Sequence, residues 1–248
     1  MDVAKAALDL PSAGPDPLPW DAALAAVLGY ARGRRPLRFR SPSNPAGAWV
    51  RIPAFGYERF DRQPGTDDPL GEHDILIAEG LHGRLDPAAW AAMKHVLDDV
   101  RPLAHAAVDR AAGRPFWELP DDEFSVLAEP GTVGAVFREI RTLSDEFPDA
   151  KPKHVAAALH HRRPDLFPLL NRTTRWQLLP HVREGDSGVE AVIHRELQAN
   201  TAAFQALEDA VVAHGLLLTR LRLHDVLLWL TGTLRLTHAV ELGRSGGR

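Results

Sequence analysis

Cysteine is absent from this chain of 248 residues, and lysine is rare, with four residues against 25 arginines. Without cysteine there is no disulfide, no thiolate metal ligand and no cysteine nucleophile. No apolar run approaches the roughly 18 residues that a transmembrane helix needs. The first ten residues mix charge with alanine and do not resemble a secretory signal. We therefore expect a cytoplasmic protein that does not associate with membranes.

The residues that are present have an ordinary balance, with 45% hydrophobic and 25% charged residues, which is typical of a soluble globular protein. The abundance of arginine and alanine is typical of a bacterial genome rich in G and C. The net charge is −4. Dedicated nucleic-acid binders are usually basic, so a nucleic-acid role would need a local basic patch.

Proline and glycine divide the chain into parts. Residues 1–19 contain five of them and predict a flexible lead-in, residues 20–240 predict a single helical domain, and residues 241–248 predict a disordered tail. The predicted fold class is mainly α.

Within that domain, residues 34–69 are irregular because prolines and glycines recur there. Two short segments, 37–40 and 49–52, can pair as a small β-hairpin. A loop region of this length inside a compact domain is often functional.

Helical periodicity and capping signals predict the remaining elements. The last predicted helix is very apolar, so we expect it to be the buried central helix. The predicted helices cover 21–32, 74–83, 86–113 with a break or kink at Pro102, a short helix after Pro120, and 131–146, 152–161, 171–182, 187–214 and 219–236.

Common catalytic motifs are missing. There is no glycine-rich phosphate loop after a strand, no His-Glu-x-x-His motif and no serine nucleophile elbow. The neighbouring His160 and His161 would point about 100° apart on a helix and could not chelate one ion. We expect neither a metal nor a cofactor.

Residues 137–176 read as a helix, a proline-containing turn, a second helix, a proline-bounded loop and a third helix. This layout resembles the helix-hairpin-helix core of the DNA base-excision glycosylases. Phe147-Pro148 stands at the family's Leu-Pro, Lys153 stands in its Lys-Thr-Ala helix start, and Asn171 stands near its catalytic aspartate. The resemblance implies a glycosylase-like helical bundle with Lys153 and Asn171 at the site.

A second resemblance covers more of the chain, in patches from about residue 30 to 236. It is carried by segments 56–60, 73–78, 159–168 and 221–229, which are similar to an uncharacterised family of actinobacterial proteins. Members of that family usually carry aspartate where this chain has Asn171. The resemblance supports a shared fold and implies no activity.

The chain departs from the glycosylase pattern at chemically important positions. Asp149 and Lys151 replace the two hairpin glycines whose backbone N–H groups approach a DNA phosphate. Side chains there also restrict the turn, and Asp149 adds negative charge. Asn171 is a neutral amide that cannot act as a carboxylate. Lys153 could still form a Schiff base if burial lowered its pKa.

Charge is unevenly distributed along the chain. Residues 150–176 carry six cations and one anion, a net charge of +5, which leaves −9 on the rest. A local basic segment can bind phosphates, sulfates or carboxylates, although it could equally be a solvated helix face. A strongly negative remainder would repel a long duplex more than a small anion.

Candidate site residues follow from these patterns, each with a structural alternative. Candidate catalytic residues are Lys153, His154, Asn171 and Asp74, with Lys153 or His154 as the acid–base group, and Asp74 could instead cap its helix. Candidate ligand-binding residues are the cations Arg172 and Arg175, Tyr57 and Glu58 in the irregular region, and His160 and Asp225. The buried pair His224-Asp225 could instead be structural and bond to Arg222 or to a loop backbone.

Three functional hypotheses remain. The leading one is an enzyme or binding protein that uses a glycosylase-like scaffold for a small anionic molecule in bacterial specialised metabolism. The second is a divergent DNA glycosylase or repair protein with Lys153 as the amine nucleophile. The third is a non-catalytic subunit that stabilises a protein partner.

Overall fold

The structure is a computed structural model that describes residues 7–37, 50–65, 69–125, 128–147 and 149–245. This part of the chain is mainly α-helical, as predicted. The helices are α1 (Trp20–Arg32), α2 (Glu72–His82), α3 (Pro87–Ala111), α4 (Asp121–Phe124), α5 (Val133–Glu146), α6 (Pro152–Arg162), α7 (Arg172–Leu178), α8 (Val189–Ala199), α9 (Thr201–Ala213), α10 (Arg220–Gly232) and α11 (Leu236–Ser245), with short 3-10 turns η2 (Tyr57–Arg59), η3 (Phe116–Glu118) and η4 (Leu179–His181).

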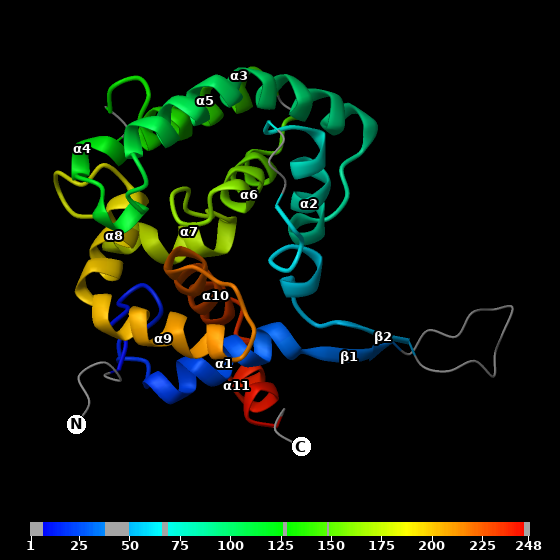
Figure 1. Ribbon diagram of the computed structural model, residues 1–248, viewed down its shortest axis with the longest axis vertical. Helices are drawn as coiled ribbons and strands as arrows, with labels where there is room; N and C mark the ends of the chain where they lie inside the picture. The colour runs from blue at the N-terminus through cyan, green and yellow to red at the C-terminus, as the bar shows by residue number, and fades with distance from the viewer. Residues whose placement is uncertain (1–6, 38–49, 66–68, 126–127, 148, 246–248) are drawn as a thin grey trace, which may run out of the picture.

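Helix α10 is the centre of the lower half of the molecule (Figure 1). It contacts α1, α7, α8, α9 and α11. Its leucines Leu223, Leu227 and Leu230 are fully buried. The helix is therefore surrounded by other elements, which confirms the prediction of a buried central helix.

The other helices pack in pairs around this centre. Helices α3 and α5 run together along the top of Figure 1, α2 packs on α6, and α1 packs on α11. Helix α5, the turn after it and α6 form the expected helix–turn–helix, and Ala150 N donates to the Phe147 carbonyl at 2.8 Å within the turn. This arrangement places the start of α6 and the start of α7 on the same side of α10.

A short hairpin forms in the irregular region, as the sequence allowed, but its first strand begins earlier than expected. Strand β1 (Arg34–Leu37) pairs antiparallel with β2 (Val50–Pro53), with Arg34 opposite Pro53 and Leu37 opposite Val50. The expected first segment was 37–40, of which 38–40 lie outside the described residues. Pro36 lies within β1, and a two-stranded ribbon has only edge strands, where proline is tolerated.

Several predicted helices differ from the structure in extent, and two of these differences have a clear physical cause. Helix α3 continues through Pro102, because a single missing hydrogen bond can be offset when Val100 and Ala104 on either side are buried. The expected single helix over 187–214 is divided into α8 and α9 at Asn200. The Asn200 amide donates to the Glu196 carbonyl at 2.8 Å and so competes with the helical bonding of the backbone.

The predicted flexible lead-in is ordered over residues 7–19. Leu8 and Leu18 exchange two backbone hydrogen bonds of 2.8 Å, and Leu8 and Leu10 are buried in the core. The Ser12 hydroxyl donates to the Glu196 carboxylate at 2.7 Å, and His224 contacts the same carboxylate at 2.7 Å. The prolines therefore shape a packed segment rather than a mobile one.

The predicted disordered tail is also wrong as far as residue 245, because α11 covers Leu236–Ser245. Its glycine content suggested disorder, but Gly243 has a packing reason. A Cβ at Gly243 would lie 1.8 Å from the Ala25 carbonyl oxygen of α1, and one at Gly29 of α1 would lie 1.7 Å from the Ala239 carbonyl oxygen. Glycine at both positions allows the two helices to pack backbone to backbone.

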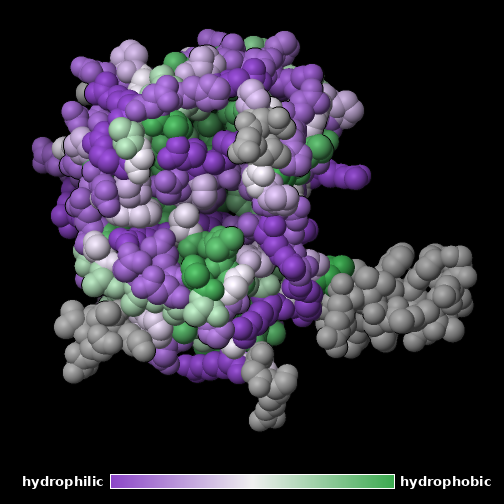
Figure 2. All heavy atoms as spheres, viewed as in Figure 1, coloured by the Kyte–Doolittle hydropathy of each residue, from purple (hydrophilic) through white to green (hydrophobic). Residues whose placement is uncertain are grey.

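The molecular surface is mostly polar on the face shown in Figure 2, where hydrophilic residues cover much of the view. No helix within the described ranges is both long enough and apolar enough to cross a lipid bilayer.

Candidate functional site

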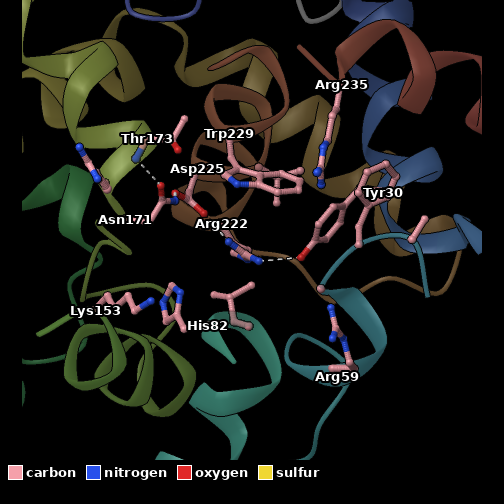
Figure 3. A pocket seen from close by; sticks show the side chains of 16 residues that line it. Tyr30, Arg59, His82, Lys153, Asn171, Thr173, Arg222, Asp225, Trp229 and Arg235 are labelled. Atoms are coloured by element: carbon pink, nitrogen blue, oxygen red, sulfur yellow. Dashed lines mark hydrogen bonds and ion pairs between the residues drawn. The ribbon is translucent and has the colours of Figure 1, made fainter. Parts of the chain in front are cut away.

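A pocket of about 390 Å³ opens between α2, α6 and the start of α7 on one side and α1 and α10 on the other (Figure 3). The segment after β2 completes its wall. The lining residues are Tyr30, Ala54, Phe55, Gly56, Arg59, Leu81, His82, Lys153, Asn171, Arg172, Thr173, Arg222, Asp225, Val226, Trp229 and Arg235.

The pocket is strongly cationic although the chain is acidic. Arg59, Lys153, Arg172 and Arg235 line it with exposed side chains, and each comes from a different part of the chain. Within the described residues, none of the four forms an ion pair with a carboxylate. Their charge is therefore available to a ligand.

The cations lie at two ends of the pocket. In Figure 3, Lys153 lies beside His82 and Asn171 at one end, whereas Arg59 and Arg235 lie at the other. Between them Arg222 points into the centre from α10. Positive charge therefore surrounds the opening rather than concentrating on a single wall.

Arg222 is the buried centre of a polar network. Its Nε and Nη2 atoms donate to the two carboxylate oxygens of Asp61 at 2.5 and 3.1 Å, and Nη2 also donates to the Tyr30 hydroxyl at 2.7 Å. The Tyr30 hydroxyl in turn donates to Asp61 at 2.6 Å. Nη1 of Arg222 donates to the Asp225 carboxylate, three residues along α10. The guanidinium also lies over the Phe60 ring, 5.5 Å from its centroid, and is fixed on every side.

Asp225 is the single carboxylate among the described residues that line this pocket. Burial raises its pKa to about 6, although the charges of Arg222 and His224 act in the opposite direction. A carboxyl group with such a pKa exchanges its proton near neutral pH, as acid–base groups in enzymes do.

Asn171 joins Asp225 to the start of α7. Its side-chain oxygen accepts hydrogen bonds from the Thr173 and Thr174 backbone N–H groups at 2.9 and 3.1 Å, so it caps the helix. Its amide nitrogen faces Asp225 at 3.4 Å. Because capping occupies the oxygen, only the N–H₂ group of Asn171 can serve a ligand.

Two histidines lie at the α2–α6 end of the pocket. His154 Nε2 is 2.9 Å from the Gly83 carbonyl, and the His82 and His154 rings are 5.3 Å apart. Burial, together with the charges of His154, Lys153 and Arg222, lowers the pKa of His82 to about 3. Burial also lowers the pKa of His154. Both rings are therefore neutral at physiological pH and do not add to the positive charge.

Aromatic side chains form the remaining wall. Phe55 stacks on Tyr30 at 5.8 Å and meets the Trp229 ring edge to face at 6.0 Å. The Arg235 guanidinium lies 5.2 Å from the centre of the Trp229 ring. A ligand in this pocket would meet an apolar surface next to a ring of cations.

Four of the ten predicted site residues line the pocket, namely Lys153, Asn171, Arg172 and Asp225. His154 is not a lining residue, but its ring lies 5.3 Å from that of the lining residue His82. The structure thus brings together residues from the helix–turn–helix segment and from α10, which lie far apart in the sequence.

Asp74 does not line the pocket and instead has the structural role of capping its helix. It accepts a hydrogen bond from the Gly71 N–H at 2.9 Å at the start of α2, and Arg162 donates to both its oxygens at 3.1 and 2.9 Å. Burial alone would raise the pKa of Asp74, but hydrogen bonds from His161, Arg162 and Gly71 outweigh it and hold the pKa at about 2. Its carboxylate is therefore fully used within the fold.

The remaining predicted residues also lie elsewhere. His160 is buried, with Nδ1 2.7 Å from the Phe167 carbonyl, and Tyr57 packs edge to face on Tyr30 at 6.2 Å. Glu58 forms an ion pair with Arg34. Arg175 is exposed and is not among the lining residues.

The buried pair in α10 separates into two networks. His224 contacts Glu196, whereas Asp225 contacts Arg222, as the sequence alternative for a structural bond suggested. Asp225 nevertheless also lines the pocket, so the structural and the ligand-binding interpretations both apply to it.

Sequence reasoning missed several lining residues. Arg222 carried a signal, because an arginine in an apolar helix three residues before an aspartate needs buried partners. The sequence gives no comparable signal for Tyr30, His82 or Arg235, since each is an ordinary residue in its own helix or turn. Their convergence depends on the packing of α1, α2 and α10.

Across the described residues, no cluster of three or more histidine, aspartate or glutamate side chains could hold a metal ion.

Comparison with known proteins gives one match. Residues 48–232 match DUF6308, described as a family of unknown function. The match covers most of the chain and includes α2 to α10. No curated protein and no solved structure matches the chain. None of these findings links it to the helix-hairpin-helix glycosylases.

Proposed function

The chain belongs to the DUF6308 family, whose function is unknown, and we propose that it binds a small anionic molecule in the pocket beside α10. The observation that carries this proposal is the set of four exposed cations, Arg59, Lys153, Arg172 and Arg235, around an opening with a single carboxylate. The volume of about 390 Å³ lies within the usual range of small-molecule sites, about 300–1,000 Å³.

The electrostatics favour a compact anion over a duplex. The basic segment 150–176 is only partly available, because Arg162 pairs with Asp74 and Arg163 with Asp165. The rest of the chain carries −9. A long polyanion would meet this negative surface, whereas a small anion would contact only the pocket.

Binding of simple anions tests the proposal. Calorimetry with sulfate, phosphate and benzoate at low ionic strength avoids screening of the exposed cations. We expect Lys153→Ala with Arg172→Ala to weaken binding by at least about tenfold, since charge-assisted hydrogen bonds each contribute about 1.5–3 kcal/mol.

The matched control is Lys151→Ala with Arg175→Ala. It removes the same charge from the same segment but outside the lining, so we expect less than about a twofold change. Equal losses in both double variants would contradict a specific pocket. Sub-micromolar binding of duplex DNA at physiological salt would contradict the preference for a small ligand.

An enzymatic role in bacterial specialised metabolism is part of this proposal. The support is chemical, since a proton-exchanging carboxyl lies in the same pocket as the cations. Gene neighbours within a biosynthetic cluster would favour it, and neighbours in a repair operon would count against it. A glycosylase-like architecture also remains a proposal, supported by the helix–turn–helix of α5 and α6.

A second candidate is a DNA glycosylase or repair lyase with Lys153 as the nucleophile. One observation favours it, because Lys153 lines the pocket near Asn171. The amine would add to the C1′ aldehyde of an abasic site and release water to form a Schiff base. Borohydride reduction should then trap a covalent protein–DNA adduct that Lys153→Ala abolishes. Absence of an adduct would exclude this chemistry.

The third hypothesis, a non-catalytic subunit, is tested by co-purification from the native host and a mass measurement. A stable second protein would favour it over an independent enzyme.

A further inference from the structure

The buried network around Arg222 contains more negative than positive groups. Arg222, Asp61 and Asp225 have side-chain exposures of 4%, 3% and 6%. One guanidinium faces two carboxylates, so the three groups would carry a net charge of −1 with both acids ionised. An uncompensated buried charge raises the free energy of the folded state, and protonation of one carboxylate removes that charge.

The two carboxylates are held unequally. Asp61 accepts two hydrogen bonds from Arg222 and one from Tyr30. Asp225 accepts one from Arg222 and faces the Asn171 amide at a longer 3.4 Å. Asp225 is therefore the more weakly stabilised anion, and it is also the one that reaches the pocket.

We propose that Asp225 takes up one proton when an anion binds, so that the pocket binds the anion and the proton together. The proton comes from solvent and is carried on the Asp225 carboxyl, and no other bond forms or breaks. The same carboxyl then faces the bound molecule as a hydrogen-bond donor. This inference rests on the proposed function, since it concerns the same pocket and the same class of ligand.

The coupling follows from electrostatics. A bound anion repels an ionised Asp225, so binding raises the free energy of the carboxylate and favours its protonated form. By reciprocity, protonation strengthens anion binding by the same factor. The raised pKa of Asp225, about 6 before any ligand enters, means that only a small further change reaches neutral pH.

The other charged groups around Asp225 do not supply this proton. On α10 itself Arg222 is always charged, and His224 faces Glu196 at 2.7 Å. From α1, burial raises the pKa of Tyr30 well above its ordinary value. From α2, the pKa of His82 is about 3, so it stays neutral across the relevant range. Asp61 already accepts hydrogen bonds from Arg222 and Tyr30. The exposed cations Lys153 and Arg172 attract the anion.

Sulfate calorimetry at pH 5 and pH 8 tests the inference, because sulfate does not itself titrate in this range. In buffers with different ionisation enthalpies, the wild type should take up at most about half a proton per bound sulfate, with the maximum near pH 6.5, midway between the free and the bound pKa of Asp225. We expect its affinity for sulfate to fall up to about tenfold between pH 5 and pH 8, which corresponds to a shift of one pKa unit on binding.

Asp225→Asn is the informative variant, because asparagine resembles the protonated carboxyl. It should bind sulfate equally at both pH values, with an affinity at pH 8 like that of the wild type at pH 5, and without proton uptake. An equal pH slope in the variant and the wild type would overturn the inference. Absence of sulfate binding in both proteins at both pH values would instead contradict the proposed function.

A second measurement does not depend on the variant folding. Carbon NMR of aspartate carboxyls in the wild type should show one buried carboxyl with a raised pKa that rises further when sulfate is added. A sulfate-independent titration of every aspartate carboxyl would overturn the inference.

Discussion

Asp74 and Asp225 are both buried aspartates that pair with an arginine, but they have different roles. Asp74 accepts hydrogen bonds from Arg162 and Gly71, and its pKa is held at about 2. Asp225 shares Arg222 with Asp61, and its pKa is raised to about 6. The difference lies in how many carboxylates each arginine serves, which the sequence of either helix does not reveal.

Asp74→Asn should lower stability while leaving the pocket intact. The variant replaces the buried carboxylate that accepts hydrogen bonds from Nε and Nη2 of Arg162, and a hydrogen bond between charged groups typically contributes about 1.5–3 kcal/mol. Urea unfolding should therefore show a clear loss, and sulfate binding by the folded protein should be unchanged. A stable variant with weakened sulfate binding would contradict the structural role and indicate that Asp74 takes part in ligand binding.

The sequence could identify Lys153, Arg172 and Asp225 because charge in an apolar or helix-start setting is visible in the chain itself. It could not identify Tyr30 or Arg235, because each is an ordinary residue until packing places it beside α10. The same limit applies to His82, whose buried Nε2 lacks a hydrogen-bond partner among the described residues. Local sequence patterns therefore predict some of the residues that line the pocket, whereas the others are brought there by tertiary packing.

At the scale of elements, caps and periodicity predicted most helices, and competition between side chains and backbone explains the exceptions. Asn200 ends α8 because its amide bonds the Glu196 carbonyl and the Asp9 carbonyl, each at 2.8 Å. Helix α11 was missed because Gly243 lowers helix propensity but permits close packing on α1. A residue that weakens a helix in isolation can be required by its neighbour.

Gly243→Ala should therefore be strongly destabilising, although alanine favours helices. The added Cβ would meet the Ala25 carbonyl oxygen at 1.8 Å, so α11 must move away from α1. Overpacking of this kind usually costs about 1–3 kcal/mol, and backbone collisions lie at the upper end.

Thermal unfolding measures this loss, and Gly14→Ala is the matched control because no atom lies within 4 Å of a Cβ there. Equal melting temperatures for Gly243→Ala and the wild type would show that α11 is not packed against α1 as described.

The molecule as a whole buries several histidines in their neutral form. Burial lowers the pKa of His160 to about 4 and that of His82 to about 3, and it also lowers those of His154 and His194. An unfolded histidine has a pKa of about 6.5. The unfolded chain therefore binds more protons than the folded one below that pH, and stability falls as pH decreases.

We expect the urea midpoint to fall between pH 7 and pH 5, with about 2 kcal/mol lost for a histidine such as His160 whose folded pKa lies below 5. Asp225 and Glu190, whose pKa values are raised by burial, act in the opposite direction, but they are two groups against four histidines. His160→Gln should have a shallower pH dependence than the wild type, and the exposed His105→Gln should have the same one. A flat profile would contradict neutral burial.

Charge at the scale of the whole molecule is not informative by itself. A net charge of −4 conceals a pocket with four exposed cations and one carboxylate, because acidic residues elsewhere outweigh them. The sequence indicated that positive charge gathers in residues 150–176. Folding divides that segment between ion pairs and the pocket, and adds Arg59 and Arg235 from outside it.

The packing of α1 on α11 also bears on how the chain is made. The ribosome adds about 5–20 residues per second, so α1 waits on the order of ten seconds or more after it emerges before α11 follows. During that time the face of α1 around Gly29 has no covering helix, since its partner is still unsynthesised. Nascent chains of this protein should therefore depend on chaperones that shield apolar helices until translation has passed α11.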